Sequence, residues 1–222
     1  DLRPVTMEPG VAPAATGSVL LKVGNTHVIC ACSVDDGVPA WMRMQNVPGG
    51  WLTGEYRMLP YANAQRKPRP DTRASGLDGR SQEIQRLVGR SLRAAVDLEA
   101  LGKRTVWLDC DVLRADGGTR TASITGAFVA LRLAVRKLMA EGKLARDPVR
   151  EPVAAVSVGM VGGKPLLDLC YEEDFAASVD MNVVMGASGR FIEVQGTAES
   201  APYTREELDA LLDLAAKGSK EL

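Results

Sequence analysis

The sequence has 222 residues, 45% of them hydrophobic and 25% charged, a composition ordinary for a globular protein with one large domain or two small ones. It contains no apolar run of the roughly 18–20 residues that would span a bilayer, and its first residues lack the pattern of a signal peptide. The formal net charge of −1 excludes a protein that is basic over its whole surface.

The charge is nevertheless unevenly distributed along the chain. Residues 57–93 hold nine Lys and Arg against three acids, a local charge of +6, so the remainder carries −7. A basic stretch on an acidic body can bind a polyanion locally. A solvated helix face joined to a loop is the other interpretation, and composition alone does not decide between them.

Four cysteines and one histidine limit the possible chemistry. Cys30, Cys32, Cys110 and Cys170 lie within or at the end of apolar runs, where we expect core thiols in a reducing, cytoplasmic compartment. His27 lies in a predicted strand, and the sequence contains no G-x-S-x-G turn. Catalytic triads and histidine-based metal sites are therefore excluded.

The first half of the chain predicts two strands, a long loop, and two helices separated by a strand. Strand-forming residues within 17–34 predict two strands, and the Pro-, Gly- and Arg-rich residues 45–80 predict the loop. Apolar residues at helical spacing predict a helix from about 81 to 102, which a glycine ends. A strand at 105–113 precedes a helix over 121–142 with one apolar stripe.

The second half predicts hairpins and a last helix. Two pairs of apolar, strand-like segments flank the glycines at 162–163 and 186–189, which is typical of hairpin turns. Thr204 and Glu207 form a capping box, which predicts the start of the last helix.

These elements are mixed without the regular alternation of a parallel α/β protein. We therefore expect an α+β fold in which mixed β-sheets are layered with helices. The change of pattern divides the chain into an N-terminal part, 1–146, which contains a glycine turn, and a C-terminal part, 147–222, which contains the hairpins and the last helix.

The glycine turn is Asp116-Gly117-Gly118-Thr119-Arg120, between the predicted strand and helix. Glycines let backbone N–H groups approach an anion closely, and a helix start offers unpaired donors and a positive dipole end. Arg120 and the threonine hydroxyl can add further hydrogen bonds. A turn that only caps the helix is equally compatible with these residues.

A second arginine and a pair of acids complete the candidate chemistry. Arg80 is near the start of the other predicted helix, which is the same design of anion site. Asp174 and Asp180 flank a short apolar stretch, so a loop or helical turn could direct both carboxylates at one point. Such a pair suits Mg²⁺, whereas two surface acids without a ligand are the alternative.

Together these segments resemble the ribonuclease PH family of bacterial phosphorolytic exoribonucleases. The resemblance covers nearly the whole chain and is carried most specifically by DVLRADGGTRTASITGA and by DMNVVM with IEVQGTAE. Further similar segments are GWLTGEYRMLP and GRSQEIQRLVGRSLRAAVDL. The resemblance implies the RNase PH-type fold, which polynucleotide phosphorylase cores and exosome ring subunits share.

The resemblance also implies a role for each matching position. The residues expected to hold the attacking phosphate are Arg80, Gly118, Thr119 and Arg120. Asp174 and Asp180 would bind Mg²⁺ or otherwise serve the phosphoryl centre, and together with the two arginines they form the expected catalytic set. The arginines that fall where the family carries tRNA-contacting residues are Arg66, Arg69 and Arg73.

The reaction and the assembly are implied in the same way. We expect inorganic phosphate to shorten the 3′ ends of tRNA precursors and other RNA, with release of nucleoside diphosphates, in a homohexamer built as a trimer of dimers. A catalytically silent subunit that only grips RNA in an exosome-like ring is the alternative. A polynucleotide phosphorylase-like enzyme is disfavoured because 222 residues are too few for two such cores.

Overall fold

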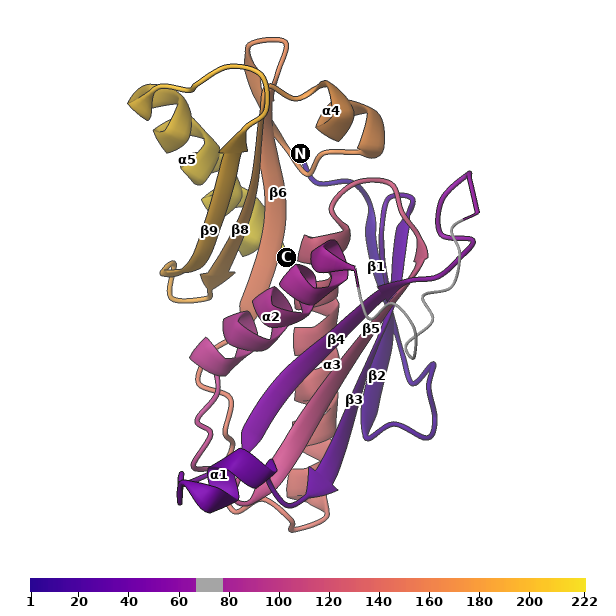
Figure 1. Cartoon of the computed structure of the whole chain (residues 1–222), viewed down its shortest axis with the longest axis vertical. Helices are drawn as coiled ribbons and strands as arrows, with labels where there is room; N and C mark the ends of the chain where they lie inside the picture. Colours follow the sequence, from indigo (N-terminus) through magenta and orange to yellow (C-terminus); the bar gives the residue numbers. More distant parts are fainter. Residues whose placement is uncertain (67–77) are drawn as a thin grey trace.

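The structure, a computed structural model, describes residues 1–66 and 78–222 and contains two β-sheets with a long helix between them (Figure 1). The strand order is β1-β2-β3-β5-β4 in the first sheet and β7-β6-β8-β9 in the second. This arrangement confirms the predicted α+β class of mixed sheets layered with helices. No helix in the described ranges is long and apolar enough to cross a bilayer.

The first sheet consists of β1 (Val5–Pro9), β2 (Gly17–Val23), β3 (Thr26–Asp36), β4 (Trp51–Met58) and β5 (Arg104–Arg114). Neighbouring strands are antiparallel, except that β4 runs parallel to β5. The chain connects these two parallel strands through α2 (Gly79–Ala94), because parallel neighbours need a crossover. A short helix, α1 (Ala40–Met44), precedes β4.

The long helix α3 (Thr119–Ala140) is buried on more than one side. It packs on β2 and β3 of the first sheet and on β6 of the second. Gly17 of β2 lies so near this helix that a Cβ there would collide with the backbone of Ala130 and Ala134. The single apolar stripe predicted for this helix is therefore too narrow, because a helix between two layers needs small or apolar residues on two faces.

The second sheet consists of β6 (Val153–Val161), β7 (Lys164–Leu167), β8 (Val179–Gly186) and β9 (Phe191–Ala198). The short helix α4 (Tyr171–Ala176) lies between β7 and β8 in the chain, and α5 (Arg205–Glu221) covers β6, β7 and β8. Both predicted hairpins and the capping box of Thr204 with Glu207 are confirmed. The predicted division at 146/147 falls in the connection between α3 and β6 and stays a prediction.

The predicted loop over 45–80 was wrong where β4 forms. Its residues Leu52 and Tyr56 are buried under α2, which packs directly on this strand. Gly54 lies in β4 where α2 comes close: a Cβ at this position would lie 2.9 Å from Cγ1 of Val88. The glycine is thus a requirement of packing rather than a sign of a loop.

The predicted helix over 81–102 was also wrong at its end, since α2 stops at Ala94. Val96 pairs with Val149 in an isolated bridge, and the carboxylate of Asp97 accepts from the N–H groups of Glu99 and Ala100. These contacts draw the chain away from the helix although its apolar spacing continues.

Candidate active site

A pocket of about 340 Å³ opens between the two sheets, at the starts of α2 and α3. It is lined by Met58, Asn63, Arg80, Ala115, Gly117, Gly118, Thr119, Arg120, Ser157, Tyr171, Asp174, Asp180 and Asn182. All six residues predicted to bind phosphate or metal are among them, although they come from α2, the glycine turn, α4 and β8. The fold therefore brings the predicted anion site and the predicted pair of acids to one cavity.

The glycine turn needs both of its glycines. Gly117 and Gly118 have φ of +75° and +64°, and Gly118 is the left-handed N-cap of α3. A Cβ on Gly117 would also collide with the carbonyl oxygen of Leu169. Among residues 1–66 and 78–222, no acceptor pairs with the backbone N–H groups of Gly118, Thr119 or Arg120. These donors are therefore free to bind an anion in the pocket.

Contacts from distant parts of the chain hold this turn in place. The Thr26 hydroxyl accepts from the N–H of Asp116 at 2.9 Å and donates to the carbonyl oxygen of Gly117 at 2.6 Å. The Arg3 guanidinium donates to the carbonyl oxygen of Asp116 at 2.5 Å and forms a two-bond pair with the Asp168 carboxylate at 2.7 and 3.0 Å. Asp168 is only 6% exposed, so this pair is a buried clamp.

The pKa of Arg3 reflects this clamp. Burial alone would lower it, but the hydrogen bond and the charge of Asp168 outweigh burial and raise the pKa above its usual value. The arginine is therefore charged at any physiological pH, and the pair stays intact.

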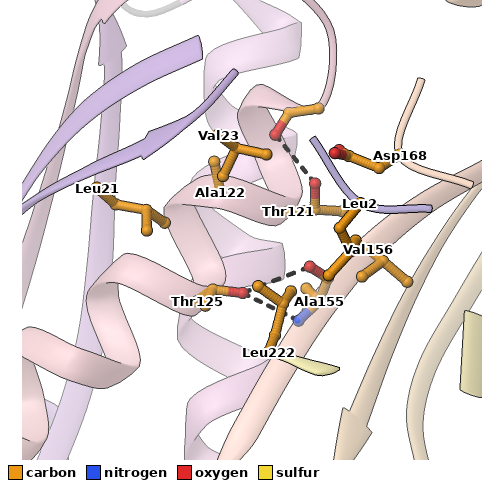
Figure 2. A pocket seen from close by; sticks show the side chains of 11 residues that line it. Leu2, Leu21, Val23, Thr121, Ala122, Thr125, Ala155, Val156, Asp168 and Leu222 are labelled. Carbon is orange, nitrogen blue, oxygen red and sulfur yellow. Dashed lines mark hydrogen bonds between the residues drawn. The ribbon is translucent and has the colours of Figure 1, made fainter. Parts of the chain in front are cut away.

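Behind the turn, α3 is joined to β6 (Figure 2). The Thr125 hydroxyl points at Ala155 of β6, accepting from its N–H at 3.0 Å and donating to its carbonyl oxygen at 3.4 Å, and the Thr121 hydroxyl donates to the carbonyl oxygen of Gly118 at 3.0 Å. The gap between these elements is only about 10 Å³, which is room for at most one water molecule. This region is therefore structural support and not a second ligand site.

Tyr56 of β4 contacts the residue that follows the two glycines of the turn. It is 1% exposed, and its hydroxyl donates to Oγ1 of Thr119 at 3.0 Å. Burial raises the pKa of Tyr56, so the phenol keeps its proton and acts as the donor of this bond. The Thr119 hydroxyl, which accepts from Tyr56, thus keeps its own proton for donation to a ligand in the pocket that Thr119 lines.

The two arginines of the pocket differ in exposure. Arg120 is 24% exposed, and its guanidinium lies 3.5 Å from the Glu83 carboxylate of α2. Arg80 is exposed in the first turn of α2, which begins after its N-cap Asp78. Both guanidinium groups line the same cavity, so both can bind an anion there through their positive charge.

The two acids on the opposite wall are partly desolvated. Burial and the neighbouring charge of Asp174 raise the pKa of Asp180 from 3.8 to about 6. Burial also raises the pKa of Asp174, although Arg80 and Arg120 act against it. Among the described residues no group of three or more His, Cys, Asp and Glu side chains could hold a metal. Two carboxylates that repel each other nevertheless fit Mg²⁺, which keeps several waters and binds substrate phosphates.

Comparison with known proteins assigns the family. Residues 1–137 match the 3′ exoribonuclease family, domain 1, and residues 151–218 match domain 2 of that family. The chain is 55% identical over 223 residues to Ribonuclease PH of Bacillus pumilus, covering 100% of this chain and 91% of that relative. It is 56% identical over 222 residues to Ribonuclease PH of Neisseria meningitidis serogroup C, covering 100% and 90%. The chain belongs to the ribonuclease PH family.

Solved structures show the same ribonuclease PH fold. A chain of the Archaeoglobus fulgidus exosome, described with RNA bound to the active site, has a TM-score of 0.80 at 25% identity and covers 100% of this chain and 87% of its own length. A chain of an archaeal exosome core has a TM-score of 0.77 at 25% identity, with 100% and 85% covered. The expected RNase PH-type fold is thus confirmed.

Of the three arginines predicted to contact RNA, the structure describes Arg66. Arg66 is exposed in the segment that follows β4. Arg69 and Arg73 lie outside the described residues, and RNA contact by any of the three arginines stays a prediction.

The sequence analysis of this ribonuclease PH protein did not predict the residues that hold the glycine turn in place behind the pocket. Arg3 and Asp168 are 165 positions apart, and no local pattern connects them. Tyr56 lies in a segment predicted as loop, where only the alternation of buried residues in WLTGEYRM could have indicated a strand.

Proposed function

We propose that this pocket holds inorganic phosphate between Arg80, Arg120 and the unpaired amides of the glycine turn, next to the 3′ end of an RNA. The observation that carries the proposal is the convergence of two arginines and three free N–H groups, opposite two acids, in one cavity. Such fixed donors stabilise the charge that develops on reacting phosphates.

The overall reaction follows from the family. As a ribonuclease PH protein, the chain is a phosphorolytic 3′ exoribonuclease, a tRNA nucleotidyltransferase that acts in tRNA processing. RNA is therefore its substrate, and the remaining question is which side chains carry out the transfer.

In our mechanism, an oxygen of hydrogenphosphate attacks the phosphorus of the last phosphodiester in line. The bond from that phosphorus to the 3′-oxygen of the preceding nucleotide breaks, and the proton of the hydrogenphosphate ends on this oxygen. The products are a nucleoside diphosphate and an RNA shorter by one nucleotide. A phosphodiester is exchanged for a phosphoanhydride, so we expect ready reversal.

The protein contributes positioning and charge. Two anions repel each other, so the guanidinium groups of Arg80 and Arg120 must hold the attacking phosphate against the RNA phosphate. The Thr119 hydroxyl, oriented by Tyr56, adds one directed donor. Because these groups are fixed before the ligand binds, little reorganisation is needed during the reaction.

Mg²⁺ is the cofactor we propose, with Asp174 and Asp180 as its protein ligands. Bound there, it would offset negative charge on the nonbridging oxygens or on the departing 3′-oxygen. The repulsion that helps to raise the pKa of Asp180 supports this assignment, because a cation would relieve it. Thermal unfolding tests this assignment independently of activity: Mg²⁺ should raise the melting temperature of the wild type but not that of Asp180→Asn.

We also propose a homohexamer, a trimer of dimers, that acts in the cytoplasm. The family resemblance and the structural similarity to an exosome core support the assembly, and light scattering should give the mass of six copies. Four free cysteines, three of them buried, suit a reducing compartment.

The decisive experiment is to incubate the protein with a tRNA that carries extra 3′ nucleotides, together with Mg²⁺ and phosphate. We expect phosphate-dependent release of nucleoside diphosphates. Release of monophosphates without phosphate would indicate a hydrolase. RNA binding without any product would indicate a silent ring subunit instead.

A further inference from the structure

Two exposed aromatic side chains lie on α4. Phe175 is 82% exposed, the most exposed large hydrophobic side chain among the described residues, and Tyr171 is 59% exposed. Their rings are stacked, with centroids 6.2 Å apart and planes 29° from parallel. Burying aromatic rings is favourable, so an exposed pair of this kind points to a ligand or partner.

The pair lies at the edge of the phosphate pocket. Tyr171 lines this pocket together with Asp174, which is three residues further along α4, and Phe175 follows next. Residues four apart lie on the same side of a helix, so the Phe175 ring extends the aromatic surface that Tyr171 begins at the pocket. The stacked rings therefore form an exposed aromatic surface that starts at the edge of the pocket.

The pair is also fixed relative to the glycine turn. The backbone N–H of Tyr171 donates to the Asp116 carboxylate at 3.1 Å. Gly117 packs against the backbone of Leu169 and Cys170, immediately before α4. Both contacts involve the backbone of this segment, so replacing the aromatic side chains leaves them in place.

The charge around the rings selects the kind of ligand. Apart from Asp174, the proposed Mg²⁺ ligand, the charged residues of α4 are Glu172 and Glu173, which would repel an RNA phosphate. The positive charge of the pocket comes from other elements, from Arg80 of α2 and Arg120 of α3. An uncharged base face fits the aromatic side, while the phosphates fit the basic side.

We propose that Tyr171 and Phe175 form a stacking platform for one nucleobase near the 3′ end of the RNA. The proposal rests on the proposed function of the same pocket and adds a base subsite to it. Stacking on an aromatic ring tolerates every base, as an enzyme that removes nucleotides one after another requires. The platform would thus hold the strand in register without reading its sequence.

The test compares Tyr171→Ala and Phe175→Ala with Phe191→Ala, which removes a 48%-exposed ring at the other end of the second sheet. Substrates are single-stranded RNA oligonucleotides, intact or with one abasic nucleotide at the last, second-last or third-last position. We expect both α4 variants to raise KM for intact RNA about tenfold, with KM for phosphate unchanged and Phe191→Ala like the wild type. For one abasic RNA, the α4 variants and the wild type should have the same KM, which identifies the stacked base.

Two results would overturn the platform. One is a KM for intact RNA that is unchanged in both α4 variants. The other is an increase in KM, relative to the wild type, that is equally large in the α4 variants for all three abasic RNAs. A change in oligomeric state with no change in RNA binding would assign the rings to a subunit interface instead. If the wild type releases no nucleoside diphosphate, the proposed function fails, and equilibrium binding of the same RNAs still tests the platform separately.

Discussion

The two helix starts that carry the pocket arginines differ in how they are held. At the start of α3, contacts from Arg3, Thr26 and Tyr56 converge on the glycine turn. At the start of α2, the side chain of Asp78 caps the helix locally, and a Cβ on Gly79 would meet nothing within 4 Å. Among the hydrogen bonds of residues 1–66 and 78–222, those that reach the first start from outside α3 come from residues far away in the sequence, and that at the second comes from the cap Asp78.

This difference suits two kinds of ligand. A phosphate ion has one fixed shape and is bound best by donors that do not reorganise, as at α3. An RNA end varies in base and conformation, and the exposed Arg80 at the start of α2, which we also expect to hold the phosphate, has room to adjust as the RNA end enters. We therefore interpret α3 as the phosphate seat and α2 as its adaptable counterpart.

The largest effect is expected from removing the buried clamp behind the α3 start. Asp168→Asn leaves the Arg3 charge without its carboxylate, so the free energy of unfolding should fall by about 3–5 kcal/mol, measured by denaturant titration. The KM for phosphate should rise, because Arg3 also holds Asp116.

The control for this clamp is Asp209→Asn, which removes an exposed pair with Arg205 and should change stability by less than about 1 kcal/mol. Equal effects of the two variants would show that the clamp does not hold the turn.

The next largest effect concerns catalysis. Arg120→Ala should remove about 3 kcal/mol of transition-state stabilisation, which is roughly a hundredfold in kcat/KM for phosphate-dependent release of nucleoside diphosphate. Arg80→Ala should lose less, because its guanidinium is more exposed and its charge is better screened. A larger loss for Arg80→Ala would reverse our assignment of the two helix starts.

A matched pair of glycine substitutions tests the backbone of the two starts. Gly117→Ala should destabilise the protein by about 2 kcal/mol, because its φ is +75° and a Cβ would strike the Leu169 carbonyl. Gly79→Ala should change stability by less than about 0.5 kcal/mol, since the added methyl meets open space. Thermal unfolding measures both, and similar values for the two variants would contradict the comparison.

The smallest effect on stability is expected from Asp180, one of the two acids that line the pocket together with both helix starts. In the absence of metal, the native state binds a proton at Asp180 between pH 3.8 and about 6, whereas the unfolded state does not, so stability falls as the pH rises through this window. Asp180→Asn should therefore be more stable than the wild type by about 1–2 kcal/mol at pH 7, a figure reduced for partial solvation.

This gain should disappear near pH 4, where the wild-type carboxyl is protonated, while the variant stays inactive at every pH. Urea titrations at pH 4 and pH 7 with a chelator present measure the difference. A wild type that is at least as stable as the variant at pH 7 would show that the carboxylate is not held under repulsion.

Several features were predictable because short stretches of chain determine them. The capping box of Thr204 with Glu207, the hairpin turns and the positive φ angles of the glycines at 117–118 are properties of short stretches of chain, and the structure contains each of them. The six pocket residues were identified in the sequence by residue type and by resemblance, and the fold brings them to one cavity.

Other features were decided by tertiary contacts alone. β4 forms because α2 packs on it, and α2 ends early because Val96 pairs with a residue more than fifty positions away. The Arg3–Asp168 clamp has no local signal at all. The sequence by itself thus determined which groups could bind phosphate, while the folded chain determined how rigidly each is held, because that rigidity comes from partners distant in the sequence.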